Sequence, residues 1–218
     1  PAAFTGTVGF KPSYGRISRH GLIAYASSFD QIGPFASNVA DAAKVMEVMA
    51  GADDFDATAI QSPMAPAGKL IPKKIAYLKT ALDHPKVDIS VKKAFQAQLE
   101  LLENAGCEVE PVEFELLDTL VPVYYILTTA EASSNLARFD GVHAGFRAQE
   151  VSDLERVYKR SRSAGFGKEV QRRIMLGTFV LSAGYYDAYF GKAQAVRRMV
   201  KDWTDKTLSE FDVLLCPT

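Results

Sequence analysis

The chain has 218 residues, 48% of them hydrophobic and 23% charged, and its 25 basic and 26 acidic residues give a formal net charge of -1. This balance argues against a chain that binds nucleic acid mainly by itself, because phosphate neutralisation by basic residues supplies most non-specific affinity. The longest uncharged stretches, residues 119–130 and 174–186, are too short to cross a bilayer. Cys107 and Cys216 lack the spacing of a metal site or disulfide scaffold, so we expect two buried thiols in a reducing cytoplasm.

The first 34 residues are irregular and rich in glycine, which predicts short strands and turns. A helix is expected next, with Ser37 as its N-cap and Gly51 at its end, because apolar residues recur between them at helical spacing. Residues 52–72 contain three prolines and predict a loop. The acidic residues Asp53, Asp54 and Asp56 lack the spacing and closing Glu of a calcium loop, so no metal site is expected there.

A strand is predicted over residues 74–78, a helix over 88–105 and a second strand over 107–114, with Gly106 closing the helix. This order is typical of a βαβ unit with parallel strands and a right-handed crossover. The chain has neither GxGxxG nor a P-loop sequence, so we interpret the unit as scaffold.

Four further elements complete an α/β chain: helices over residues 120–139, 170–189 and 192–207, and a strand over 211–217. Residues 152–173 carry many basic side chains with acids between them. We expect a solvated helical face there, with a phosphate-binding patch as the alternative.

Catalytic patterns are absent from the sequence itself. It has no G-x-S-x-G, and its three histidines are scattered without metal-ligand spacing. Ser27 and Ser28 are followed by Asp30, but adjacency in sequence provides neither a general base nor an oxyanion hole. Residue chemistry alone therefore points to no active site.

Residues 1–43 resemble the stretch after the catalytic serine in amidase-signature enzymes, most strongly at FKPSYGR (residues 10–16) and SSFDQIGP (residues 27–34). Two further runs narrow the resemblance to the A subunits of glutamyl-tRNA(Gln) amidotransferases. These runs are AEASSNLARFDG (residues 130–141) and RRIMLGTF (residues 172–179), which continues to YYDAY (residues 185–189).

The resemblance implies a mixed β-sheet sandwiched between helices, and a serine nucleophile activated through a second serine and a lysine. In the family these three residues precede the position of Pro1. We therefore expect residues 1–218 to be a single amidase-signature domain truncated at both ends. It would hold no catalytic residue and would be inactive alone.

The parent reaction implied by the resemblance is release of ammonia from glutamine. Ammonia would pass to a B subunit, which uses ATP and Mg²⁺ to convert Glu-tRNA(Gln) to Gln-tRNA(Gln). The implied partners are glutamine, the B and C subunits, and tRNA mainly through the partner subunit. We expect no cofactor in this chain, no membrane, and a cytoplasmic location.

The resemblance also implies an arginine that grips the α-carboxylate of glutamine and a tyrosine beside it. Motif position assigns these roles to Arg173 and Tyr124, with Tyr125 as the rival tyrosine and Arg172 as the rival arginine. A guanidinium suits the role because it donates two parallel hydrogen bonds to a carboxylate. The alternative for Arg173 is a helix-surface arginine in a salt bridge.

Two other functions remain open. One is a different amidase-signature hydrolase that acts on a simple or aryl amide and has no tRNA partner. The other is a non-enzymatic interaction domain, and co-purification with B- and C-type subunits would separate the amidotransferase from both.

Overall fold

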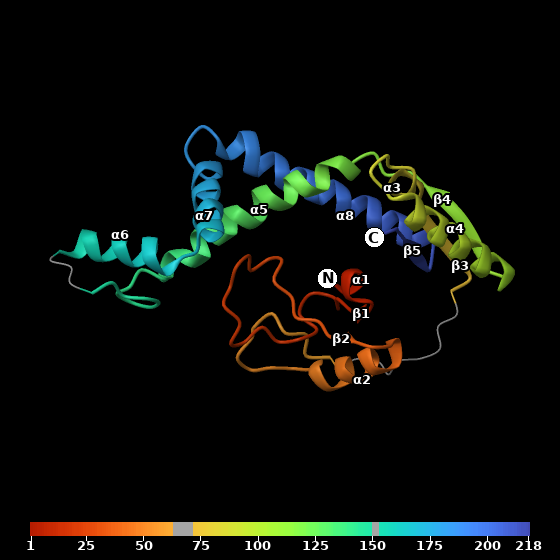
Figure 1. Cartoon of the computed structure of the whole chain (residues 1–218), viewed down its shortest axis with the longest axis horizontal. Helices are drawn as coiled ribbons and strands as arrows, with labels where there is room; N and C mark the ends of the chain where they lie inside the picture. The colour runs from red at the N-terminus through yellow and green to blue at the C-terminus, as the bar shows by residue number, and fades with distance from the viewer. Residues whose placement is uncertain (63–71, 150–152) are drawn as a thin grey trace. The chain divides into compact units, whose positions relative to one another are not determined.

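The structure, a computed structural model of the chain, describes residues 1–62, 72–149 and 153–218 (Figure 1). The chain divides into two compact units, each assembled from segments that are distant in sequence. Unit 1 comprises Pro1–Ala67 and Tyr125–Gly191, and unit 2 comprises Gly68–Tyr124 and Lys192–Thr218. The single domain expected over residues 1–218 stays a prediction.

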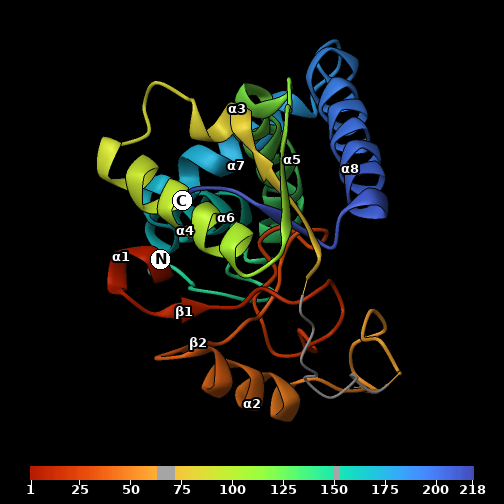
Figure 2. The same cartoon turned by 90° about the vertical axis from the view of Figure 1, so that its right-hand side faces the viewer.

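The N-terminal part of unit 1 contains little regular structure, as its glycines predict. Its elements are α1 (Ala2–Thr5), β1 (Val8–Gly9), β2 (Phe35–Ala36) and α2 (Val39–Met49). The two strands pair antiparallel, and Figure 2 shows α2 beside β2. The predicted helix is confirmed, but its N-cap is Asn38 and not Ser37. Asn38 Oδ1 accepts a 2.9 Å hydrogen bond from Asp41 N, which satisfies a donor of the first turn.

The loop predicted over residues 52–72 is confirmed where the structure describes it. Residues 52–62 contain no helix or strand. Residues 63–71 of the predicted loop lie outside the described residues.

The remaining part of unit 1 is helical. Its elements are α5 (Leu120–Asn135, which begins in unit 2), a 3₁₀ turn (Leu136–Arg138), α6 (Leu154–Gly165), α7 (Lys168–Val180) and a π-helix (Tyr186–Gly191). The single helix predicted over residues 170–189 is wrong in its second half. The helix ends at Val180 with Leu181 as its C-cap, and the chain then turns through residues 181–185, where Gly184 has a φ of 85° that favours glycine.

The basic segment is mostly an exposed, ion-paired helix. On α6, Arg156 pairs with Asp153 at 3.2 Å and Lys159 pairs with Glu155 at 2.6 Å, and all four side chains are about half exposed or more. Arg162 is different, because its Nη1 donates to the carbonyl oxygens of Leu136 at 2.9 Å and Phe139 at 3.1 Å. It thereby caps the 3₁₀ turn after α5.

Unit 2 is an α/β layer, as predicted. Its elements are β3 (Lys74–Leu78), α3 (Lys79–Leu82), α4 (Ile89–Asn104), β4 (Glu108–Val112), a 3₁₀ turn (Leu117–Thr119), α8 (Lys192–Glu210) and β5 (Val213–Leu215). The strand order is β4-β3-β5 and both pairings are parallel. The predicted strands and the helix between them are therefore confirmed, and so is the α/β class.

Helices cover both faces of this sheet. Figure 2 shows α4 and α8 to either side of the strands. On β3, Ile75 and Ala76 point to opposite faces, and both are almost completely buried. Asp212 Oδ2 accepts hydrogen bonds from the backbone N–H groups of Lys73 and Lys74 at 2.8 and 3.0 Å, which joins the start of β5 to the start of β3.

Two further predictions concern the cysteines and the hydropathy of the helices. Cys107 is half-buried, but Cys216 is exposed because it lies just after β5 ends. The prediction of two buried thiols is therefore wrong for Cys216, and Cys107 meets it only in part because it is not fully buried. Every helix in the described ranges is too short or too polar to cross a bilayer.

Candidate functional site

Arg173 lies at the centre of an aromatic cluster in unit 1. It comes from the second turn of α7, and its side chain is 25% exposed. Its Nε donates a 3.0 Å hydrogen bond to Glu169, one turn earlier, and its Nη1 donates a 2.8 Å hydrogen bond to the Tyr25 hydroxyl. The guanidinium carbon lies 5.6 Å from the centre of the Tyr25 ring and 5.5 Å from that of Tyr125. Both distances are within the range of cation–π attraction.

The electrostatics of this cluster favour a permanent positive charge. The hydrogen bond to Tyr25 and the pairing with Glu169 hold the pKa of Arg173 above its ordinary value, and partial burial only partly opposes them. A guanidinium has five N–H donors. Two of these contact Tyr25 and Glu169, and among the described residues no side chain or carbonyl accepts the other three. The geometry leaves donors for an anionic ligand such as a carboxylate.

The segment that carries Tyr25 is attached to α5 by polar contacts. Glu131 accepts hydrogen bonds from both the backbone N–H of Ser28, at 2.9 Å, and the Ser28 hydroxyl. Asn135, one turn later, donates to the carbonyl of Tyr25 at 3.2 Å and to the Ser27 hydroxyl at 3.0 Å. Within the segment, Asp30 Oδ2 accepts from the N–H of Tyr25 at 2.9 Å. The two family-like runs at residues 27–34 and 130–141 therefore bind each other.

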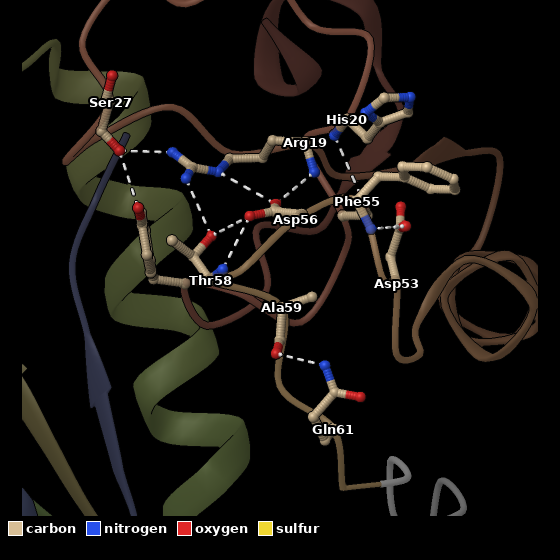
Figure 3. Close-up of polar contacts among 11 residues, drawn as sticks. Arg19, His20, Ser27, Asp53, Phe55, Asp56, Thr58, Ala59 and Gln61 are labelled. Carbon is tan, nitrogen blue, oxygen red and sulfur yellow. Dashed lines mark hydrogen bonds and ion pairs between the residues drawn. The ribbon is translucent and has the colours of Figure 1, made fainter.

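A second polar cluster joins Arg19 to the loop at residues 52–62. Figure 3 shows Arg19 between Asp56, Thr58 and Ser27. Arg19 N donates to Asp56 Oδ2 at 2.8 Å, and the guanidinium donates to the Ser27 carbonyl at 2.5 Å and to Thr58 Oγ1 at 2.9 Å. Hydrogen bonds from the Thr58 hydroxyl, at 2.6 Å, and from the Arg19 and Thr58 amides hold the pKa of Asp56 well below its usual range. A cavity of about 170 Å³ adjoins the cluster. Arg19 and Asp56 pair with each other beside this cavity, and Asp30 accepts hydrogen bonds from backbone N–H groups, so we interpret the cavity as structural.

The structure brings together some of the predicted ligand residues. Arg173 and Tyr125 are in contact, and Tyr25 completes the cluster. Arg172 pairs with Glu169 at 3.6 Å and its side chain is 76% exposed, which leaves Arg173 as the arginine of the aromatic cluster. Tyr124 lies next to Tyr125 on α5 and is exposed, but it belongs to unit 2, so its place beside Arg173 stays a prediction.

Sequence reasoning missed three contributors. Glu169 precedes Arg173 by four residues on one helix, a spacing that predicts an ion pair, so the salt bridge expected as the alternative does form. Tyr25 and Glu131 act through contacts that span more than 100 residues, and no local pattern indicates those contacts.

The weaker candidates have structural roles. Ser28 donates to the carboxylate of Glu131, an acceptor that also binds the Ser28 backbone. In the acidic trio, Asp56 pairs with Arg19 and Asp53 accepts from Phe55 N at 2.8 Å. Across the described ranges, no group of three or more His, Cys, Asp or Glu side chains is arranged to hold a metal ion. The expected lack of catalytic residues stays a prediction.

Comparison with known proteins supplies the family context. The family model described as Amidase matches residues 1–218. The chain is 48% identical over 223 residues to the A subunit of glutamyl-tRNA(Gln) amidotransferase from Fusobacterium nucleatum, covering 100% of this chain and 45% of that protein. A protein with the same name from Staphylococcus aureus is 49% identical over 224 residues, with 100% of this chain and 46% of that protein covered. The chain thus spans less than half the length of these relatives.

The fold is also similar to a solved structure. The crystal structure of the A subunit of glutamyl-tRNA(Gln) amidotransferase from Thermotoga maritima matches with a TM-score of 0.73 and 40% sequence identity. The match covers 100% of this chain and 43% of that chain.

Proposed function

This chain belongs to the amidase family, and we propose that it is part of the glutamine-hydrolysing A subunit of a glutamyl-tRNA(Gln) amidotransferase. Identities of 40–49% over the whole chain to proteins of that name support the proposal. The observation that carries the proposal is the environment of Arg173. Its charged side chain lies between Tyr25 and Tyr125, and some of its N–H groups remain available to a ligand. An enzyme for apolar amides has no use for a carboxylate clamp.

In this proposal Arg173 binds the α-carboxylate of glutamine, with Tyr124 or Tyr125 beside it. The side-chain amide would then face a serine nucleophile, which a second serine and a lysine activate. These three residues would come from sequence that precedes Pro1 in the full-length protein. The serine attacks the amide carbon, oxyanion-hole donors stabilise the tetrahedral intermediate, and ammonia leaves.

The other parts of the reaction belong to proposed partners. Ammonia would travel to a B subunit that activates Glu-tRNA(Gln) with ATP and Mg²⁺, so this chain needs no cofactor. A C subunit would complete the complex, and tRNA would be bound mainly through the partner subunit. The formal net charge of -1 supports the last point. Such a complex would act in translation, in the cytoplasm.

The test is to express the full-length protein that carries this chain together with B- and C-type subunits. The proposal predicts co-purification of the three, ammonia release from glutamine, and glutamine-dependent formation of Gln-tRNA(Gln). Hydrolysis of an aryl amide without use of glutamine would favour the other amidase-signature activity. Failure to co-purify with the B- and C-type subunits, together with no hydrolysis of any amide, would favour an interaction domain.

A further inference from the structure

The hydroxyl of Tyr25 lies between Arg173 and a buried threonine. It donates a hydrogen bond to Thr128 Oγ1, at a long distance of 3.4 Å, and accepts one of 2.8 Å from Arg173 Nη1. Thr128 has no exposed surface, and it lies on α5 one turn after Tyr125. The three side chains therefore form a chain of hydrogen bonds that leads from the interior to the guanidinium.

The backbone of Tyr25 is held as firmly as its hydroxyl. Its N–H donates to Asp30, and its carbonyl accepts from Asn135. These contacts fix the backbone of Tyr25, and rotation of its ring would break the hydrogen bonds of the hydroxyl to Thr128 and Arg173. The guanidinium lies close to the ring as well as to the hydroxyl. Tyr25 thus restricts both the position and the rotation of the guanidinium plane.

The direction of these hydrogen bonds has a chemical consequence. Because the Tyr25 hydroxyl donates its proton toward Thr128, its lone pair is directed at Arg173, which can only donate. A neutral oxygen orients the guanidinium without neutralising its charge, unlike a second carboxylate. The charge and the remaining N–H donors thus stay available to an anionic ligand.

We propose that Tyr25 is a positioning residue for glutamine binding. It holds the guanidinium of Arg173 in the plane in which its N–H groups can bind the carboxylate of glutamine. This rests on the proposed glutaminase function. Tyr25 itself need not touch glutamine. Loss of the Tyr25 hydroxyl leaves the charge of Arg173 in place but allows the guanidinium to rotate. Affinity for glutamine therefore falls while the chemical step is preserved.

The experiment compares Tyr25→Phe with Tyr14→Phe in the full-length protein assembled with its B and C subunits. Tyr14 is a matched control, because its hydroxyl also donates one hydrogen bond, of 2.9 Å, to the Ser27 carbonyl in the same unit. We expect Tyr25→Phe to raise KM for glutamine about tenfold with kcat within about twofold, as for loss of a hydrogen bond to a charged group. With free ammonia as nitrogen donor, the rate of Gln-tRNA(Gln) formation should be unchanged. Tyr14→Phe should change neither KM nor kcat with glutamine, and it should leave the rate with free ammonia unchanged.

A second variant tests the same chain of hydrogen bonds without changing Tyr25. Thr128→Val keeps the shape of the buried side chain and removes the acceptor of the Tyr25 proton, so KM for glutamine should rise about threefold. If both variants match Tyr14→Phe while unmodified protein uses glutamine, the positioning role is wrong and the glutaminase function stands. If the unmodified complex releases no ammonia from glutamine, the proposed function fails and this inference fails with it.

Discussion

Gly177 of α7 packs directly against the backbone of Thr129 on α5. A Cβ atom at residue 177 would lie 1.9 Å from the Thr129 carbonyl oxygen and 2.9 Å from Cβ of Ser133. The helices can therefore cross in backbone contact only if residue 177 is glycine. One turn before this crossing on each helix are Arg173 and Tyr125, whose side chains are in contact. The crossing is what aligns the arginine with the tyrosine.

Gly177→Ala should therefore destabilise the chain. In an open helical position this substitution stabilises, because alanine has the higher helix propensity. Here the clash with Thr129 dominates, and we expect a loss of about 1–3 kcal/mol in the free energy of unfolding, measured by urea denaturation.

The control for this prediction is Gly51→Ala. Gly51 lies in the same unit, and a Cβ there would have nothing within 4 Å. Its substitution should leave stability unchanged or raise it by up to about 0.5 kcal/mol. Equal unfolding midpoints for the two variants would contradict the close crossing.

Glu131 should contribute more to stability than an exposed glutamate does. Glu131→Ala leaves the half-buried N–H of Ser28 without its acceptor, which should cost about 1–3 kcal/mol in the free energy of unfolding. Glu155→Ala breaks only the ion pair with Lys159, whose two side chains are 75% and 73% exposed. Its cost should stay below about 0.5 kcal/mol. Chemical denaturation of both variants would compare them, and equal losses would argue against the bridge from Glu131 to residues 25–30.

Asp56 should make stability depend on pH in a predictable direction. Its pKa in the folded chain is lowered, first by the Thr58 hydroxyl and then by the amides of Arg19 and Thr58. The stabilising effect is therefore fully present above the unfolded-state value of about 4, and it is lost as the pH falls through the lower folded-state pKa. At pH 7 the Asp56→Asn variant should be less stable than the unmodified chain. This difference in stability should become smaller below about pH 4.

The control is Asp54→Asn, which alters an exposed carboxylate two residues away. Thermal unfolding measured from pH 7 to pH 3 should show no such pH-dependent change in the stability difference between Asp54→Asn and the unmodified chain. A constant difference between Asp56→Asn and the unmodified chain over that range would show that the carboxylate is not held in its charged form.

Regular elements with strong periodicity were predictable from sequence. The helix now seen as α4 and the strands on either side of it follow from alternating and 3.6-residue patterns, since both elements bury one set of side chains. The end of α7 was not predictable in the same way. Apolar residues continue past Val180, so the periodic pattern does not indicate the turn at residues 181–185 that separates α7 from the π-helix.

The candidate site was only partly predictable for a related reason. Motif position singled out Arg173, and the i,i+4 spacing from Glu169 was visible on the same helix. Tyr25 lies 148 residues from Arg173 in sequence, and it reaches the arginine only because Glu131 and Asn135 attach its segment to α5. Contacts of that separation come from tertiary packing and leave no local signal.

The central claim is that Arg173 binds the carboxylate of glutamine. The most direct measurement is the rate of Gln-tRNA(Gln) formation by the full-length complex with Arg173→Ala, with either glutamine or free ammonia as nitrogen donor. Loss of two charge-assisted hydrogen bonds should lower kcat/KM for glutamine roughly a hundredfold while the ammonia-supported rate is retained. Arg172→Ala, which alters the more exposed neighbour, should behave like unmodified protein with both donors. Equal losses with glutamine and with ammonia, or equal effects of the two substitutions, would contradict the claim.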